Sequence, residues 1–248
     1  MRTQLTVAIA ALLMLTSLTG AAGEPVTYEV NGLMYEGYYA AAEESRGLVL
    51  LIHDWDGLTE YEERRAEMLV ELGYSVFAAD LFGAGVRPTE VVDKRQHTGE
   101  LYADREKMRA LMRGALATAR ERGAEGAAVA MGYCFGGAAV LELARSGDDL
   151  RGFASFHGGL STPDGQDYSA TAGKVMVYHG TADTAISMQD FAGLADELES
   201  AGIPHEMVTY SATPHAFTVF GSPRYREEAD TKSWASWVGF LDEQFGGE

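Results

Sequence analysis

The chain has 248 residues, 46% of them hydrophobic, which suits one sizeable domain with a full core. Its 37 acidic and 19 basic residues give a formal net charge of −18, which would repel nucleic acid and anionic membrane surfaces. The simplest interpretation of this acidity is a solvated surface that keeps the protein soluble.

The first 23 residues have the composition of a secretory signal peptide. Arg2 supplies a positive start, residues 7–15 an apolar stretch, and residues 20–22 the small side chains of a cleavage site. The apolar stretch falls short of the roughly 20 residues that a membrane span needs, although an uncleaved anchor remains the alternative. We therefore expect an exported protein, periplasmic or secreted, with a single domain over residues 24–248.

Strands and helices are expected to alternate along the rest of the chain. Alternating apolar and polar residues around Asn31-Gly32 predict an antiparallel hairpin over residues 26–40. Continuous apolar runs predict strands buried on both faces, and apolar residues at helical spacing predict helices. The further predicted strands are 47–52, 75–80, 127–130, 152–156, 174–179 and 206–210; the predicted helices are 59–72, 101–123, 188–201 and 229–245, with one more after Cys134. This order predicts an α/β fold, a mostly parallel sheet covered by helices on both faces. The first of these helices should begin with a capping box formed by Thr59 and Glu62.

The segment 127–139, AAVAMGYCFGGAA, contains the only cysteine of the chain. A buried strand that ends in G-x-C-x-G and runs into an apolar helix is typical of a nucleophile elbow, with Cys134 in the usual place of serine. Gly132 and Gly136 would allow the tight turn, and the start of the following helix would favour the thiolate. The alternative is that Cys134 is a small buried hydrophobe. In an oxidising compartment a lone thiol cannot form an internal disulfide, which favours a catalytic role.

Two further residues follow predicted strands, where the active groups of open α/β sheets lie. Asp183 follows the strand KVMVYHG, and His215 follows the last strand. The order nucleophile, acid, histidine is that of α/β-hydrolases, in which the histidine activates the nucleophile and the acid orients the histidine. Taken singly, Asp183 could cap a helix and His215 could be a loop residue. Together with Cys134 they predict a catalytic triad.

The motifs GYCFG, HGTAD and PHAF resemble those of the dienelactone hydrolase family of α/β-hydrolases, and the resemblance covers residues 26–245. It implies a single α/β-hydrolase domain without a large lid. It also implies hydrolysis of a lactone or ester through a cysteine acyl-enzyme, with Cys134 as nucleophile, His215 as base and Asp183 as its orienter.

The resemblance extends to the groups around the triad. It implies an oxyanion hole formed by the backbone N–H groups of Phe135 and Trp55. The family also has an acidic residue, usually glutamate, that interacts with the resting thiol, and Asp54 stands at that position. Aspartate is one methylene shorter, and the alternative is that Asp54 is a loop or cap residue. His53 and His157 lie at strand ends and are expected to line the pocket.

The family's founding enzymes bind a substrate carboxylate with two arginines, and this chain departs from that pattern. The matching positions are Ala84 and Val219, with Arg87 near the first as the one candidate replacement. Since arginine pairs both oxygens of a carboxylate, its loss predicts a preference for neutral esters or lactones.

The sequence therefore predicts a cofactor-free cysteine hydrolase that acts as a monomer on a small carboxylic ester, lactone or thioester. No paired histidines or cysteines have metal-ligand spacing, so no metal site is expected. Two alternatives remain open. One is a peroxide-reactive thiol protein, against which the absence of a resolving cysteine argues. The other is a non-catalytic binding scaffold on the same fold, against which the complete set of triad residues argues.

Overall fold

The computed structural model describes residues 23–246, so the expected signal peptide, residues 1–23, lies outside the described residues except for Gly23. The strands are β1 (Glu24–Val30), β2 (Leu33–Ala40), β3 (Leu48–Ile52), β4 (Ser75–Ala79), β5 (Ala128–Tyr133), β6 (Gly152–Phe156), β7 (Lys174–Gly180) and β8 (His205–Tyr210). The helices are α1 (Glu60–Val70), α2 (Val91–Ala103), α3 (Arg105–Glu121), α4 (Phe135–Arg145), α5 (Met188–Ala201) and α6 (Glu227–Phe245).

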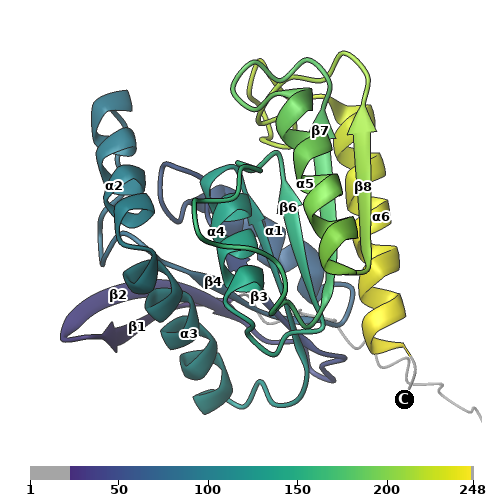
Figure 1. Cartoon of the computed structure of the whole chain (residues 1–248). Helices are drawn as coiled ribbons and strands as arrows, with labels where there is room; N and C mark the ends of the chain where they lie inside the picture. The colour runs from purple at the N-terminus through teal and green to yellow at the C-terminus, as the bar shows by residue number, and fades with distance from the viewer. Residues whose placement is uncertain (1–22, 247–248) are drawn as a thin grey trace, which may run out of the picture.

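All the strands listed form one sheet in the order β1-β2-β4-β3-β5-β6-β7-β8 (Figure 1). β1 pairs with β2 and β2 with β4 in antiparallel fashion, and the remaining neighbours are parallel. The hairpin turns at Asn31 and Gly32, whose positive φ angles of 52° and 79° are those of a tight hairpin turn. The predicted α/β fold and its N-terminal hairpin are confirmed.

Helices cover both faces of the sheet because the central strands are apolar on both sides. One core layer joins the sheet to α3, α4 and α5 and includes Leu111, Val140 and Leu194. The opposite layer joins it to α1 and α6 and includes Leu69 and Trp237. No helix within residues 23–246 is long and apolar enough to cross a membrane.

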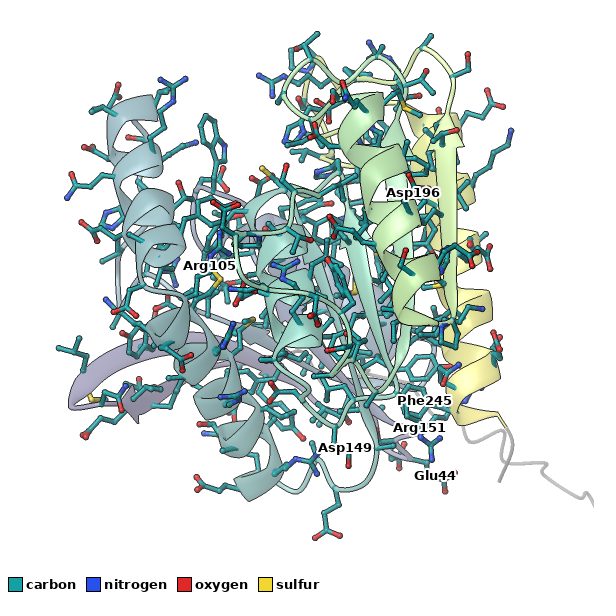
Figure 2. The ribbon with its side chains drawn as sticks, viewed as in Figure 1. Glu44, Arg105, Asp149, Arg151, Asp196 and Phe245 are labelled. Atoms are coloured by element: carbon teal, nitrogen blue, oxygen red, sulfur yellow. The ribbon has the colours of Figure 1, made fainter. Side chains whose placement is uncertain are left out.

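The predicted long helix over residues 101–123 is wrong, because the chain breaks at Asp104 into α2 and α3. Asp104 has φ −121° and ψ 78°, outside the helical region, and its side chain accepts a hydrogen bond from the Lys107 N–H at 3.0 Å. An aspartate that caps a new helix ends the preceding one. Arg105, labelled in Figure 2 where α3 begins, donates to Glu142 on α4 at 2.9 Å and so fixes the break against the core. As a result α2 is a separate helix, which projects at the upper left of Figure 1.

The turn from β5 into α4 requires glycine at two positions. A Cβ atom on Gly136 would overlap the carbonyl oxygen of Ile52 at the end of β3, and one on Gly132 would overlap the backbone of Gly136. Cys134 lies between them with φ 51°, a strained angle for a residue with a side chain. This close approach brings the start of α4 against the ends of β3 and β5.

Gly136→Ala is expected to lower the free energy of unfolding by about 2 kcal/mol or more, since rotation of a side chain cannot relieve overlap with a backbone carbonyl. The matched control is Gly193→Ala on α5, where a Cβ atom meets nothing within 4 Å. It should stabilise the protein by about 0.5 to 1 kcal/mol, because alanine is the better helix former. Denaturant unfolding of both variants makes the comparison. Equal stabilities would contradict the close approach of α4 to β3.

Candidate active site

The three residues of the expected triad meet at the carboxyl ends of parallel strands. The arrows of β7 and β8 point to the top of Figure 1. Cys134 follows β5, Asp183 follows β7 and His215 follows β8. His215 Nε2 lies 3.1 Å from Cys134 Sγ, and His215 Nδ1 lies 2.7 Å from Asp183 Oδ2. One continuous chain of hydrogen bonds therefore joins the thiol to the carboxylate through the imidazole ring.

The Asp183 carboxylate is held in place and kept ionised. Its other oxygen accepts the backbone N–H groups of Ala185 at 2.8 Å and Ile186 at 2.9 Å. Although burial alone would raise the pKa of Asp183, the hydrogen bonds from His215 and from these N–H groups lower it below the ordinary value. An ionised Asp183 accepts the Nδ1 proton of His215, which leaves Nε2 free to take a proton from Cys134.

The environment of Cys134 favours the thiol over the thiolate. Burial raises its pKa well above the ordinary value, and the Asp54 carboxylate raises it further by charge and by a hydrogen bond. The Phe135 N–H at the start of α4 acts in the opposite direction but does not outweigh them. The expectation that the helix terminus favours a resting thiolate is thus corrected, and the thiol has to be deprotonated by His215 when it reacts.

Asp54 interacts with the thiol despite its short side chain, because each group shifts the pKa of the other. Its Oδ1 also accepts the Trp55 N–H at 2.5 Å, so one of the two expected oxyanion-hole donors is engaged by this carboxylate. Burial first, and then the charge of Asp56, raise the pKa of Asp54 to about 6. The carboxylate therefore changes charge near neutral pH beside the sulfur of Cys134.

A cavity of about 510 Å³ opens above Cys134. Its apolar part is formed mainly by Trp55, Phe135, Ile186 and Pro214, and its polar part by the triad region and by side chains of α2. The residues that line it are Asp54, Trp55, Arg95, Thr98, Tyr102, Cys134, Phe135, Gly159, Thr184, Ala185, Ile186, Pro214, His215, Ala216 and Arg224. Both expected oxyanion-hole residues thus face the same space as the thiol.

His53 does not line this cavity, contrary to expectation. It is fully buried, its Nε2 accepts the Leu81 N–H at 3.1 Å and its Nδ1 lies 2.5 Å from the Asp54 carbonyl oxygen. Both ring nitrogens are therefore used to join the ends of β3 and β4. The residue supports the loop that carries Asp54 and is not available to a substrate.

His157 also lies outside the cavity, behind His215. Its ring centroid is 5.3 Å from that of His215, and its Nε2 is 2.8 Å from Thr218 Oγ1. Thr218 in turn lies 2.7 Å from the Tyr61 hydroxyl of α1. Burial, and next the charge of His215, hold the pKa of His157 well below its ordinary value. His157 is thus a neutral group that packs the loop of His215 against α1.

Arginine does reach the cavity, but from positions that sequence reasoning missed. Arg87 does not line it: its Nη1 donates to the Val86 carbonyl at 2.8 Å and lies 3.6 Å from Asp80. Arg95 on α2 and Arg224 after β8 line the cavity instead, and neither guanidinium has a hydrogen bond or ion pair with any of residues 23–246. The expectation that Arg87 is the one candidate cation of the pocket is therefore corrected.

The spacing of residues on α2 is the sequence feature from which Arg95 could have been predicted to line the cavity. Arg95, Thr98 and Tyr102 all line the cavity, and their spacing places them on one face of a helix. That face becomes visible only once α2 is recognised as a separate helix. Arg224 has no such signal, because it lies in the loop that precedes α6. Within the described part of the chain, no three His, Cys, Asp or Glu side chains are grouped so as to hold a metal ion.

Comparison with known proteins places this geometry in a family. Residues 35–245 match the family model described as the dienelactone hydrolase family. A structure titled "m3DLH" is 29% identical with a TM-score of 0.83, and the alignment covers 90% of this chain and 98% of that one. A dienelactone hydrolase-like promiscuous phosphotriesterase, P91, from metagenomic libraries is 27% identical with the same TM-score and the same coverage.

More distant structures share the fold. A dienelactone hydrolase homologue from Klebsiella pneumoniae subsp. pneumoniae is 18% identical with a TM-score of 0.74, and the alignment covers 88% of this chain and 97% of that one. No curated protein gave a significant match.

Asp54→Asn is expected to speed alkylation of Cys134 by iodoacetamide about tenfold above pH 6, because a one-unit fall in the thiol pKa gives ten times more thiolate. The variant should react faster because of charge. Above its pKa of about 6, the Asp54 carboxylate of the wild type opposes a second negative charge on the sulfur. Below pH 5 the carboxyl group of the wild type is neutral, so the two rates should converge. The pH dependence of alkylation measures this, with Asp167→Asn on the exposed surface as control. A rate ratio that stays constant with pH would contradict the assignment.

Proposed function

Because this chain belongs to the dienelactone hydrolase family, we propose that it is a cysteine hydrolase that cleaves a carboxylic ester, lactone or thioester through a covalent acyl-enzyme. The observation that carries the proposal is the hydrogen-bonded chain from Cys134 through His215 to Asp183, which opens onto the cavity. An elbow nucleophile, a base within reach and a buried acid behind it are the parts that acyl transfer requires.

In the first half of the proposed reaction, His215 Nε2 takes the proton of Cys134 while the sulfur attacks the carbonyl carbon of the substrate. The carbonyl oxygen becomes an oxyanion and accepts the N–H groups of Phe135 and Trp55. The Trp55 N–H must first leave the Asp54 carboxylate, or share it with the oxyanion. Collapse of the tetrahedral intermediate breaks the ester bond, and the leaving alcohol takes the proton from His215.

In the second half, a water molecule attacks the thioester on Cys134. His215 takes a proton from this water, and the same oxyanion hole stabilises the second tetrahedral intermediate. The carbon–sulfur bond then breaks, the acid product leaves and the thiol recovers its proton. Asp183 remains ionised throughout and stabilises the imidazolium form of His215.

The other interpretations explain the site less well. A peroxide-reactive thiol is activated by a lowered pKa, whereas burial and Asp54 raise that of Cys134. A non-catalytic scaffold would not need His215 and Asp183 aligned with the sulfur. The proposal further includes export, for which the composition of residues 1–23 is the support, and action as a monomer without a cofactor.

The cavity favours a substrate that carries a negative group as well as an apolar part. Arg95 and Arg224 approach it from different elements, and their guanidinium groups are unpaired among the described residues. In a chain with a net charge of −18, unpaired cations beside the nucleophile would give a local attraction for an anion. We therefore replace the expectation of a neutral ester with that of an ester or lactone bearing a carboxylate or a similar anion.

Cys134→Ala should lower kcat/KM for ester hydrolysis by at least about a thousandfold, because the nucleophile and its base act as a unit. A panel of chromogenic esters, thioesters and lactones, tested on the wild type and the variant, measures this. Unfolding curves of the two proteins should nearly coincide. Activity of the alanine variant close to that of the wild type would refute the catalytic role of Cys134.

The double variant Arg95→Gln/Arg224→Gln should lose about thirtyfold in kcat/KM for an anionic ester, since charge-assisted contacts at exposed sites are worth about 1 kcal/mol each. For the neutral counterpart of the same ester the change should be less than twofold. Arg87→Gln is the matched control, because Arg87 lies outside the cavity. The preference for the anion should also weaken at high salt. A wild type that prefers the neutral ester would restore the original expectation.

A further inference from the structure

The capping box at the start of α1 lies beneath the loop that carries the expected oxyanion hole. Thr59 is the N-cap of α1 and Glu62 is its N3 residue, as the sequence predicts. Glu62 Oε2 accepts the Thr59 N–H at 2.9 Å and the Thr59 hydroxyl at 2.8 Å. One carboxylate oxygen is therefore enough to complete the box.

The other carboxylate oxygen of Glu62, Oε1, forms a hydrogen bond outside the capping box. Oε1 accepts the backbone N–H of Asp54 at 3.2 Å, so the carboxyl group links the start of α1 to the loop that follows β3. The next N–H along this loop belongs to Trp55, the expected oxyanion-hole donor. Each peptide unit is rigid, so once the Asp54 N–H is held, only the φ and ψ angles of Asp54 can change the direction of the Trp55 N–H. The Asp54 side chain limits these angles further, because its Oδ1 accepts the Trp55 N–H.

Capping alone does not account for the burial of Glu62. The side chain is fully buried, and no lysine or arginine among the described residues forms an ion pair with it. Burial, with a contribution from the charge of Asp54, raises the pKa of Glu62 to about 8. The chain forms the same kind of box on α5 with Ser187 and Asp190, near the surface. Burying a carboxyl group without a cation is unfavourable, so the location under the loop calls for a role beyond the cap.

We propose that Glu62 is a positioning residue that shapes the oxyanion hole: by holding the Asp54 N–H, it keeps the loop in place so that the Trp55 N–H, which donates to Asp54 Oδ1 in this structure, can turn to the carbonyl oxygen of a substrate on Cys134. The inference rests on the proposed hydrolase function. Glu62 lies outside the residues that line the cavity, so it acts through the loop and does not touch the substrate.

Three variants separate this role from helix capping. Glu62→Asp should retain a box of the kind that Asp190 forms on α5, but its shorter arm cannot also reach Asp54. Glu62→Ala removes both contacts. Asp190→Ala removes a box of the same design whose two residues, Ser187 and Asp190, do not line the cavity, and is the matched control.

Two reactions of Cys134 serve as readouts. Acylation by 4-nitrophenyl acetate, followed as the burst of 4-nitrophenolate, passes through an oxyanion. Alkylation by iodoacetamide forms a carbon–sulfur bond as the carbon–iodine bond breaks and iodide leaves, and creates no oxyanion. A change in the oxyanion hole should therefore affect acylation alone, whereas a general loss of structure should affect both reactions.

We expect Glu62→Asp and Glu62→Ala to slow acylation at least tenfold with little change in KM, while alkylation changes by less than threefold. Asp190→Ala should leave both rates within threefold of the wild type. If Glu62→Ala does not fold, the Asp variant alone decides. The positioning role is refuted if the Glu62 variants behave like Asp190→Ala, or if acylation and alkylation fall by the same factor. A wild type that is alkylated at Cys134 but acylated by no ester would instead refute the hydrolase proposal itself.

Discussion

The close approach of α4 to the ends of β3 and β5 is the constraint on which the site depends. Gly132 and Gly136 allow backbone to pack directly on backbone, and the strained φ of 51° at Cys134 turns the sulfur out of the sheet. The same contact brings the Phe135 N–H to the sulfur and places the loop after β3 beside it. A larger residue at either glycine would separate the nucleophile from Asp54 and Trp55 at once.

The electrostatics of the site oppose ionisation of the thiol and at the same time prepare it for reaction. Burial and Asp54 keep Cys134 protonated, whereas Asp183 keeps His215 oriented with Nε2 toward the sulfur. A sulfur that is protonated at rest is protected from alkylating and oxidising molecules, which need the thiolate. In the proposed reaction, proton transfer to His215 is coupled to attack on a substrate, whose oxyanion takes over the negative charge.

The sequence predicts the sheet, and the meeting of Cys134, Asp183 and His215 at its edge, because both follow from local patterns. Continuous apolar runs identify the central strands, and Cys134, Asp183 and His215 each stand directly after one of them. The positions of the side chains around these three residues are harder to predict from the sequence. His53 and His157 stand at strand ends as expected, but their side chains turn inward to Leu81 and Thr218, a choice that depends on neighbours far away in the sequence.

The helix α2 is not predicted as a separate helix, because its sequence lacks a regular apolar pattern. Its apolar residues do not form one continuous stripe, and Val91 and Val92 remain exposed, so periodicity does not reveal it. Contacts between side chains hold it instead: Lys94 lies 3.5 Å from Asp56, and His97 stacks on Phe82. Without α2, the contribution of Arg95 to the cavity could not be predicted.

The position of α2 also divides the molecule into a part that reacts and a part that recognises. Cys134, Asp183 and His215 come from loops anchored in the sheet, while Arg95, Thr98 and Tyr102 come from α2, which contributes only Leu101 to the core layers. Substitutions on that helical face can alter which molecules enter the cavity without disturbing the strands that hold the nucleophile. Part of the lining that would contact a substrate is therefore separate in the fold from the strands that hold Cys134, Asp183 and His215.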